Sequence, residues 1–503
     1  LLDSDVEVID SAAVSKTDYA TITAAGNISG SLAYAATTAT LDAAGALSES
    51  SATGLDVVLE AADISNASVT AFNTVELTAT ADNISGGSIT ADGAVTIDAG
   101  YGYIQGTTAL GGSTIDLTAG KEIDGSDFTA AGKISVLQAT DLAASSFISE
   151  TGAIEVAAVD NIVDSMIWAK AGTVTITAVA EELDGSTISA LSGLTLDANW
   201  VVGSSLIAEN GLLDVDATTI DGSELLSKQG GIELGVDALN DSNLAAYGNI
   251  DVSGVAPAVS TITAGSMTSK NGNVTVDNFA TVNALTVNAR NDALFGTIGT
   301  IIGGEFITAR NTTLNTSGEI GGVTVQATGD ASLTTGASAD IVNSTIEGKN
   351  VNLTAGGKLS NVSVEAELTA DIEASGNIFN ANVLGRDLLV ESNGGDITAS
   401  TFEAVNTVDL SAADELNGLI VHAAGNADLL VNADPALAGL AIRAVSGSWI
   451  IGGEYIAEDG SIFMNATKNI VGSNIVAKQA DGTAVVTLKA GAEVDGVIVD
   501  LPG

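Results

Sequence analysis

The sequence of 503 residues contains no cysteine, three prolines and a single histidine, His422. Without cysteine there are no disulfides and no thiolate metal sites, and cysteine usage says nothing about the redox compartment. One histidine excludes a metal site built from several histidines and allows at most one Ser–His pair. The sequence therefore assigns no catalytic and no cofactor-binding residue. It leaves metal sites undetermined.

Basic residues are also scarce, with 15 Lys and Arg against 63 Asp and Glu and a formal net charge of −48. We expect no nucleic-acid partner, because binding phosphates requires a basic face. An acidic surface of this density keeps chains soluble and attracts divalent cations diffusely. The longest apolar runs, such as Leu437–Ile442, are too short to cross a bilayer, so we expect no membrane span.

Large side chains are few, since aromatic residues make up 4 % of the chain while glycine occurs 57 times. Ala, Thr, Ser, Val and Ile fill most of the remainder, and the β-branched residues among them favour extended structure. Such a chain has ample apolar content but little bulk for a wide core. The composition therefore favours a narrow core.

A repeat runs through most of the chain. The segment Asn83 to Ala99, NISGGSITADGAVTIDA, and the segment Leu183 to Ala198, LDGSTISALSGLTLDA, follow one template. It begins with an apolar residue, then a turn residue, Ser, a second apolar residue and Ala, and it ends in Val-x-Ile/Leu-x-Ala. Apolar and polar residues alternate within it, as in strands with one buried face. A fixed period of this length is typical of a solenoid.

The leading apolar residue of the template recurs about every 19 to 20 residues. We assign it to Ile64, Ile84, Ile104, Ile123, Leu142, Ile162, Leu183, Val202 and Ile220, and after a looser middle to Ile302, Ile320, Ile341, Leu359, Ile378, Ile397, Leu416 and Ile470. The pattern predicts an all-β, single-stranded parallel β-helix, or β-solenoid. It would have about 24 coils of 19–20 residues and three short strands per coil, stacked about 4.8 Å apart.

We expect one continuous solenoid over residues 1–503, with irregular coils near 239–298 and 424–460. The second irregular segment contains Pro435 and resembles a compressed coil. Either segment could carry a protruding loop. Neither has the length or composition of a linker.

Equivalent residues of successive coils should stack into ladders inside the solenoid. Two walls of such ladders would hold Ile123, Leu142, Ile162 and Leu183, and Phe128, Phe147, Ile167 and Ile188. A narrow position would hold Ala130, Ala169, Ala190, Ala309, Ala327, Ala366, Ala404 and Ala477. A corner position would hold Ser126, Ser145, Ser165, Ser186, Ser223, Ser344, Ser400 and Ser473. We expect the serine hydroxyls to bond to each other or to turn backbone.

Few residues are candidates for chemistry. Because no histidine or lysine repeats beside the serines, the serine row is predicted to be structural rather than nucleophilic. His422 lies in an alternating segment, LIVHAAG, and is expected to be a surface or wall residue. Parallel β-helices include polysaccharide lyases and glycosidases, which use paired carboxylates. The candidate acidic pairs are Glu122 with Asp124, Glu181 with Glu182, and Asp214 with Asp216.

The four arginines, Arg290, Arg310, Arg386 and Arg443, are scattered. Arg290 and Arg310 fall one coil apart and could stack. A β-elimination enzyme would need a basic residue beside a carboxylate-bound cation, and among 63 acidic residues nothing in the sequence singles out one pair for that role. We therefore expect no enzymatic activity.

The S-x-I-x-A-x-G-x-V-x-I-x-A cadence at Ser88 to Ala99, and again near Ser186 to Ala198, resembles the haemagglutination-activity repeats of filamentous haemagglutinin-like exoproteins. The resemblance covers most of the chain. It implies a right-handed β-helix, export to the cell surface, and a role in adhesion or matrix building. This family's amino-terminal secretion module, with its N-P-N-G-type motif, does not occur in the sequence. The chain would correspond to the shaft alone.

Three functions stay open at this point. The first is a non-enzymatic structural rod of an extracellular filament or cell-surface fibre, and the second is the shaft of a secreted adhesin that binds glycans or matrix. The third is a polysaccharide-active β-helix enzyme. Both ends of the sequence have strand character and no evident cap, so we expect end-to-end self-association or continuation of a longer chain.

Overall fold

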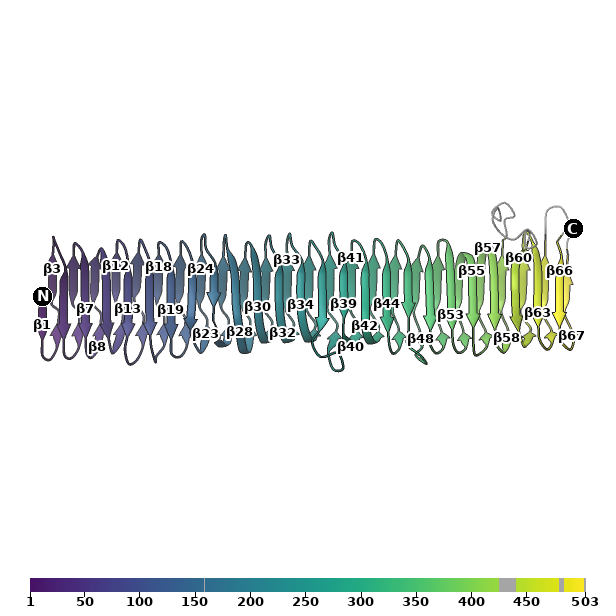
Figure 1. Ribbon diagram of the computed structural model, residues 1–503, viewed down its shortest axis with the longest axis horizontal. Helices are drawn as coiled ribbons and strands as arrows, with labels where there is room; N and C mark the ends of the chain where they lie inside the picture. Colours follow the sequence, from purple (N-terminus) through teal and green to yellow (C-terminus); the bar gives the residue numbers. More distant parts are fainter. Residues whose placement is uncertain (158, 425–439, 479–483, 502–503) are drawn as a thin grey trace. The chain divides into compact units, whose positions relative to one another are not determined.

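The computed structural model describes residues 1–157, 159–424, 440–478 and 484–501. The chain folds as an all-β parallel β-solenoid of about 24 coils, which confirms the predicted fold class. It divides into two units, Leu1–Ile250 and Asp251–Gly503, and Figure 1 shows successive coils side by side within each unit. Continuity of one solenoid over residues 1–503 stays a prediction.

The described residues form no α-helix, so none of them belongs to a helix long and apolar enough to cross a membrane.

Each coil has three walls, and one coil of unit 1 illustrates them. β13 (Val75–Ala79) forms the first wall, β14 (Ile84–Ser85) the second and β15 (Ser88–Ala91) the third. The chain then enters the next coil with β16 (Val95–Ala99), and Val75 pairs with Val95 in parallel register. Equivalent residues in unit 1 are 17 residues apart for Ser51 and Ser68, and up to 21 apart for Ile162 and Leu183. Three short strands per coil are thus confirmed.

The remaining strands of unit 1 follow the same order. The first wall also contains β1 (Leu2–Ser4), β4 (Ala20–Ala24), β7 (Thr38–Ala43), β10 (Asp56–Ala61), β19 (Ile115–Ala119), β22 (Ile134–Gln138) and β25 (Ile154–Val156). The second wall also contains β2 (Val8–Ile9), β5 (Ile28–Ser29), β8 (Ala46–Ser48), β11 (Asp63–Ser65), β17 (Ile104–Gln105), β20 (Ile123–Asp124), β23 (Asp141–Ala143) and β26 (Val159–Val163). Four longer strands continue from the first wall into the second: β28 (Thr173–Asp184), β30 (Gly193–Val202), β32 (Leu213–Asp221) and β34 (Ile232–Asn240).

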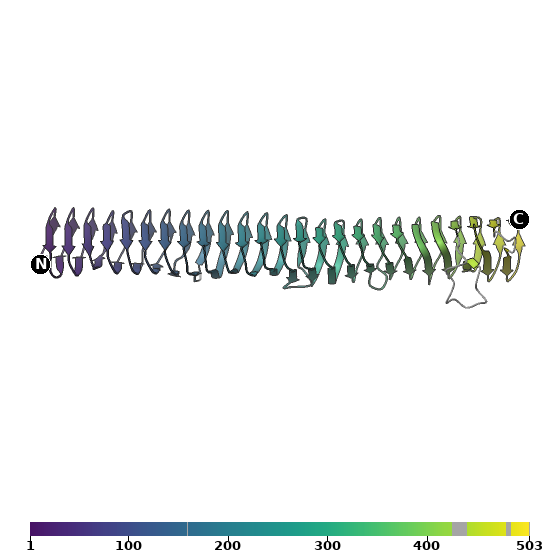
Figure 2. The same ribbon diagram turned by 90° about the horizontal axis from the view of Figure 1, so that it is seen from above.

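The third wall of unit 1 is the most regular of the three, because nearly all of its strands have four residues. Its other members are β3 (Ala12–Ser15), β6 (Leu32–Ala35), β9 (Ser51–Gly54), β12 (Ser68–Ala71), β18 (Thr108–Gly111), β21 (Asp127–Ala130), β24 (Ser146–Ser149), β27 (Met166–Ala169), β29 (Thr187–Ala190), β31 (Ser205–Ala208), β33 (Glu224–Ser227) and β35 (Asn243–Ala246). In Figure 2 the corners of successive coils lie in register within the unit.

Unit 2 repeats this plan. Its first wall has β36 (Ile250–Gly254), which holds the boundary between the units, β39 (Val274–Asp277), β42 (Ala293–Ile302), β44 (Thr312–Thr316), β47 (Ala331–Thr334), β50 (Val351–Ala355), β53 (Thr369–Ala374), β60 (Leu440–Gly447), β63 (Ser461–Ala466) and β66 (Val486–Ala490). Its second wall has β37 (Thr261–Thr263), β40 (Phe279–Asn283), β45 (Ile320–Gly321), β48 (Ile341–Val342), β51 (Leu359–Ser360), β54 (Ile378–Phe379), β56 (Ile397–Thr398), β58 (Glu415–Asn417), β61 (Trp449–Ile451), β64 (Ile470–Val471) and β67 (Val494–Asp495).

Its third wall has β38 (Ser266–Ser269), β41 (Thr286–Ala289), β43 (Glu305–Thr308), β46 (Thr324–Ala327), β49 (Thr345–Gly348), β52 (Ser363–Ala366), β55 (Asn382–Ser392), β57 (Thr401–Ala412), β59 (Ile420–Ala423), β62 (Glu454–Ala457), β65 (Asn474–Ala477) and β68 (Ile498–Asp500). β55 and β57 continue from the third wall into the first wall of the following coil.

The core of each unit is a narrow column of stacked apolar side chains. Strand residues alternate between buried and exposed, as in β13, where Val75, Leu77 and Ala79 are buried. The predicted ladder from Ile123 to Leu183 and the ladder Phe128, Phe147, Ile167 and Ile188 are both present in register. The rings of Phe128 and Phe147 stack with their centroids 5.3 Å apart. Alternation therefore identified the inward residues along most of the chain.

Two ladder assignments are wrong by one residue. Leu183 pairs with Val201 rather than Val202, and Ile320 pairs with Ile301 rather than Ile302. Val201 and Ile301 are fully buried, whereas Ile302 is 41 % exposed. Both errors occur at a pair of adjacent apolar residues. A shift of one residue moves a side chain to the opposite face, and the pattern alone does not decide which of two identical neighbours faces inward.

The narrow position is the last residue of each third-wall strand, and its assignment is corrected at one coil. Ala289 pairs with Thr308, so Thr308 and not Ala309 occupies the inward position. Ala309 is exposed. The Thr308 hydroxyl lies 2.9 Å from the Thr312 hydroxyl, which gives the buried oxygen a partner. Elsewhere in this column the small residue is alanine, glycine or serine, as in the pair Ala366 and Gly348.

One left-handed residue, or two in succession as at Gly86 and Gly87, turns the chain from the second wall to the third. Gly125 has a φ of +54°, and Asn343, Asn361 and Asn380 occupy the same place with φ values of 52°, 54° and 51°. Asparagine tolerates this conformation better than most residues with a Cβ. The Asn361 amide donates to Asn343 Oδ1 at 3.0 Å, and the Asn380 amide donates to Asn361 Oδ1 at 2.8 Å. The asparagines thus form a short ladder of their own.

Insertions occur at the segments expected to be irregular. Residues 255–260 form a turn between β36 and β37, with Val255 and Val259 exposed. Leu416 pairs with Ile450, 34 residues further on, so this coil is longer than its neighbours and the prediction of a compressed coil is wrong. Pro435 lies outside the described residues.

Candidate functional site

From Ser126 to Ser242 the serine row is a continuous hydrogen-bonded chain at the corner between the second and third walls, and in other coils the same position also holds Ala, Gly, Leu or Val. The Ser126 amide donates to the Ser145 hydroxyl at 3.1 Å, and the Ser145 amide donates to the Ser165 hydroxyl at 3.2 Å. Most of the hydroxyls donate to the carbonyl two residues earlier, as Ser145 does to Ala143 at 2.8 Å, whereas Ser473 donates to the Gly452 carbonyl at 2.9 Å. The prediction that these hydroxyls bond to turn backbone is confirmed.

The row is longer than the sequence indicated. The same contacts include Ser31, Ser50, Ser204, Ser242 and Thr107. Ser204 and Ser242 follow a turn residue as the template requires, so the sequence carried the signal for them. The one-residue error at Val202 displaced the template there.

This geometry leaves the serines unsuited to nucleophilic catalysis. Ser126, Ser145, Ser165 and Ser186 are each at most 2 % exposed. Every one of their hydroxyls donates one hydrogen bond and accepts another from backbone. A nucleophile needs access to substrate and a base within hydrogen-bond reach. Their contacts are those of structural residues.

The acidic pair Glu122 and Asp124 flanks the buried Ile123 in β20. Burial raises the pKa of Glu122, and the charges of Asp124 and Asp141 raise it further. Asp124 accepts a hydrogen bond of 2.9 Å from the Gln105 amide of the preceding coil. The pair is a partly buried group of like charges on the second wall.

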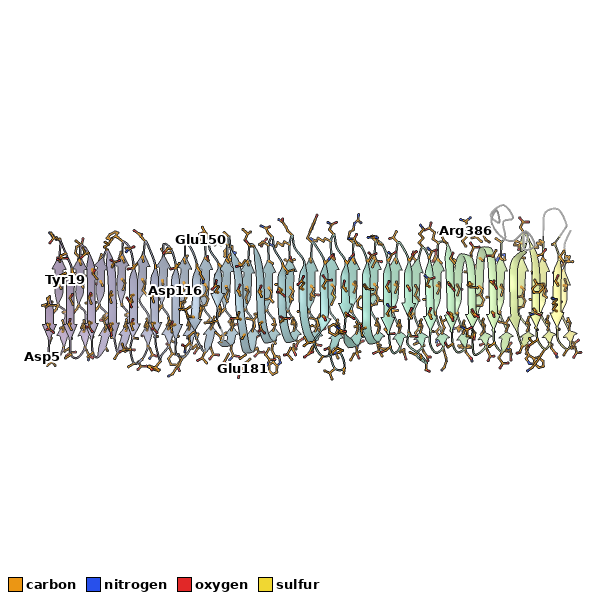
Figure 3. All side chains as sticks on the ribbon, viewed as in Figure 1. Asp5, Tyr19, Asp116, Glu150, Glu181 and Arg386 are labelled. Atoms are coloured by element: carbon orange, nitrogen blue, oxygen red, sulfur yellow. The ribbon has the colours of Figure 1, made fainter. Side chains whose placement is uncertain are left out.

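Glu181 and Glu182 are held by one asparagine. The Asn161 amide donates to Asp141 Oδ1 at 2.8 Å and to Glu181 Oε2 at 3.4 Å, while the Glu182 backbone N–H donates to Asn161 Oδ1. Figure 3 shows Glu181 at the edge where the first wall turns into the second. Asn161 thus links three coils, and its side chain lies between the carboxylates of Asp141 and Glu181.

Asp214 and Asp216 lie on the outward side of β32, and Asp214 pairs with Glu233 of the next coil. Burial raises the pKa of Asp214, and the Asp216 charge adds to the rise. An equivalent pair in unit 2, Asp371 and Glu373, was missed in the sequence. Burial and then the Glu373 charge raise the Asp371 pKa. The motif of two acids separated by one residue on a strand is the signal for both pairs.

Asp214 and Asp216 belong to a broader acidic face on the first wall of unit 1. The outward carboxylates of this wall, of which Figure 3 labels Asp116, are Asp3, Asp42, Asp56, Glu60, Glu76, Asp98, Asp116, Glu155, Asp197, Asp214, Asp216 and Glu233. Within the described part of the chain, no group of three or more His, Asp or Glu residues is arranged to hold a metal ion. Diffuse attraction of divalent cations stays a prediction.

His422 lies on the outward side of β59, as the sequence predicted. Its Nε2 atom is 3.6 Å from Glu458 Oε1, and Lys478 Nζ is 3.0 Å from Glu458 Oε2. The three residues come from successive coils at the corner after the third wall. All three side chains are about 40 % exposed. Glu458 and Lys478 form a surface ion pair, with the His422 imidazole beside it, and an exposed pair of this kind contributes little to stability.

Tyr455 is a polar residue that the sequence gave no reason to single out. It lies inside β62 between Val421 and Ile475 and is fully buried. Its hydroxyl has no hydrogen-bond partner among the described residues, and burial raises its pKa. A substrate has no route to this enclosed hydroxyl, so it is not a candidate for chemistry.

The arginines do not form the predicted stack. Arg290 follows Ala289, and its equivalent in the next coil is Ala309 rather than Arg310. The Arg310 guanidinium instead lies 3.5 Å from Asp292 Oδ2. The side chain of Arg443 lies outside the described residues.

One groove of about 610 Å³ combines both charges on the outside of unit 2. It follows the corner between the third and first walls from β43 to β57, and Figure 3 labels Arg386 at that corner. Its floor holds small residues such as Gly348 and Gly385, while Glu347 and Glu365 pair across adjacent strands. Lys349 and Arg386 supply the positive charge at its rim. Sequence reasoning missed this groove because its residues come from six coils.

No protein-family model, no curated protein and no solved structure matches the chain. The parallel β-solenoid fold agrees with a β-helix shaft. Membership of the haemagglutinin-like exoproteins stays an expectation from the repeat cadence.

Proposed function

We propose that this chain is a non-enzymatic structural element, the shaft of an extracellular filament or cell-surface fibre. The observation that carries the proposal is the serine chain, in which repeating hydroxyls are buried and bonded to the backbone of adjacent coils. The repeating serines are thus used to join coils. Repetition here serves the continuity of the solenoid.

The energetics of stacked coils suit a long shaft. In solenoids each repeat contacts mainly its neighbours, so length can be added without changing the local packing. Parallel pairing joins every described coil to the next within each unit. The acidic first wall keeps such elements apart from one another in solution.

The location is part of the proposal. The net charge of −48 keeps the surface hydrated in a saline medium that contains divalent cations. With the cadence shared with exported repeats, this charge favours the cell exterior.

Immunogold electron microscopy of intact source cells tests the proposal. An antibody against the folded chain should decorate filaments or fibres outside the envelope, and unpermeabilised cells should label as strongly as permeabilised ones. Label confined to the cytosol would overturn the extracellular assignment. If electron microscopy of negatively stained native material showed only isolated rods of single-chain length, the filament proposal would be overturned.

The groove of unit 2 supports a second candidate, a shaft that binds glycans or matrix. Glu347, Glu365, Lys349 and Arg386 offer acceptors and donors to sugar hydroxyls along one corner. A glycan array probed with the chain and with the Glu365→Gln variant checks this. Binding that the variant abolishes would favour the adhesin, and absence of binding to every glycan and matrix protein would favour the structural shaft alone.

The absence of activity is tested separately. Acidic polysaccharides incubated with the chain, with and without calcium, should stay intact by size-exclusion chromatography. Release of unsaturated or reducing ends would overturn the non-enzymatic assignment.

A further inference from the structure

The outward face of the third wall in unit 1 differs from the rest of this acidic molecule. Its outward residues, two per strand from β3 to β35, are Ala12, Val14, Leu32, Tyr34, Ser51, Thr53, Ser68, Thr70, Ser88, Thr90, Thr108, Leu110, Asp127, Thr129, Ser146, Ile148, Met166, Trp168, Thr187, Ser189, Ser205, Ile207, Glu224, Leu226, Asn243 and Ala245. Only Asp127 and Glu224 among them carry charge. From β3 to β18 the face has none.

Large apolar side chains are exposed on this face. Leu110 is 49 % exposed, Tyr34 43 % and Trp168 40 %. They share the face with small hydroxyl residues that lie in register, as Thr70 does with Thr90. From β3 to β18 the face is contiguous and uncharged, and exposed apolar side chains gathered among polar ones often mark an interaction site.

We propose that this face is the contact surface for a second copy of the same chain, related to the first by a two-fold axis. The proposal goes beyond the structural role, since it assigns lateral pairing and not only longitudinal continuity. Two chains of net charge −48 repel each other wherever carboxylates meet. In unit 1, the third wall is the face on which two copies can approach without placing carboxylate rows opposite each other.

The size of the face fits a stable dimer. Thirteen strands at about 4.8 Å give a length of about 60 Å, and four residues at about 3.3 Å give a width of about 13 Å. The resulting area of about 800 Å² per partner equals that of a standard protein interface. Closed two-fold dimers are the commonest assembly of identical chains.

The chemistry of the face favours a protein copy over a sugar. Leu110, Ile148, Met166 and Trp168 require an apolar partner surface, which an identical face supplies. Sugar recognition relies on polar side chains that fix hydroxyl groups, and the charged or amide side chains on this face are limited to Asp127, Glu224 and Asn243. The Lys170 ammonium covers the Trp168 ring from the corner at 4.8 Å, so the edge of the face is polar. A polar rim is part of the usual anatomy of a protein interface.

Sedimentation equilibrium of the full chain tests the proposal with two matched variants. Leu110→Glu places a carboxylate on the third wall, and Leu137→Glu places one on the first wall, where Leu137 is 60 % exposed. We expect wild type to dimerise, and Leu110→Glu to raise the dissociation constant about tenfold or more, because it buries an unpaired charge. Leu137→Glu should leave the constant unchanged. Thr90→Glu should act as Leu110→Glu does, and circular dichroism confirms that all variants stay folded.

Salt gives an independent signature. Added NaCl screens repulsion between the two acidic chains, so the dimer should tighten as ionic strength rises. A wild-type chain that stays monomeric at every concentration and salt level would overturn the proposal. So would equal weakening by Leu137→Glu and Leu110→Glu. Binding of a neutral polysaccharide by the monomer, lost in Leu110→Glu, would also overturn it and assign the face to a glycan.

Discussion

The first and third walls of unit 1 share one interior and one alternating pattern, yet their outward faces differ in charge. The first wall carries carboxylates such as Glu76, Asp116 and Glu155, and the third wall has only Asp127 and Glu224. On both walls the inward residues are fixed by packing, because each must fit between the coils above and below. The outward residues are free of that requirement, so their chemistry reflects what each face meets.

Unit 2 shows that the fold does not require an uncharged third wall. There the same outward positions hold Glu305, Glu347, Glu365 and Glu403. The coils stack in the same parallel register with these carboxylates in place. The lack of charge on the third wall of unit 1 is therefore a property of that face.

The largest effect is expected where the two walls do not differ, in their common core. Phe128→Ala removes a ring stacked on Phe147 and should lower the free energy of unfolding by about 3–5 kcal/mol. Denaturant titration followed by circular dichroism measures the loss. The outward neighbour provides the control, since Thr129→Ala should change it by less than about 0.5 kcal/mol. Equal effects would contradict the assignment of the two sides of β21.

The next effect is expected at the serine corner. Ser145→Ala removes the acceptor of the buried Ser126 amide and should cost about 1–3 kcal/mol, because that N–H would be left without a partner. Ser146→Ala, one residue further and directed outward on β24, is the matched control. Hydrogen exchange at the Ser126 amide reports the same contact locally. If Ser145→Ala and Ser146→Ala lose the same free energy of unfolding, the serine hydroxyls do not stabilise the corner.

A smaller effect is expected from exchanging the charges of the two faces. Ser205→Asp places a carboxylate beside Glu224 on the third wall and should lower stability by about 0.2–1 kcal/mol. Asp214→Asn relieves repulsion with Asp216 and Glu233 on the first wall and should raise it by a similar amount. Both changes should shrink in high salt. Ser205→Asn separates side-chain size from charge, and a loss as large as that of Ser205→Asp would contradict the electrostatic reason.

The smallest effect is a pH dependence with opposite signs at two aspartates of the first wall. The pKa of Asp214 is raised by burial, so its contribution to stability grows as pH falls from neutral toward 4 and is lost as pH rises through the folded-state pKa. The pKa of Asp56 is lowered, chiefly by the Thr74 hydroxyl bond of 2.7 Å. Its contribution is present above the unfolded-state pKa and is lost as pH falls through the folded-state value.

Unfolding curves recorded from pH 7 to pH 3 measure these slopes. Asp214→Asn should make stability fall more steeply on acidification than in wild type, and Asp56→Asn should make it fall less. Slopes that change in the same direction for both variants would contradict the two assignments.

The sequence predicted the interior better than the surface sites. Alternation and period placed Ile123, Phe128 and Ser145 in the correct ladders, because each coil imposes the same sterics on equivalent positions. It failed at Val202 and Ile302, where two adjacent apolar residues leave the facing ambiguous. It also missed the groove of Glu347, Lys349 and Arg386, whose residues are about one coil apart in sequence and share no motif.

The sequence alone determined that the chain forms stacked parallel coils with a narrow apolar core, since period, alternation and small residues repeat locally and each coil packs by the same rules. Only the tertiary structure decided which hydroxyls bond to which backbone and which of two apolar neighbours faces inward. It also decided that residues from thirteen coils, all but two of these coils without charge at the outward positions, form one face of unit 1. These outcomes depend on residues about twenty positions apart that come together only when the register between coils is fixed.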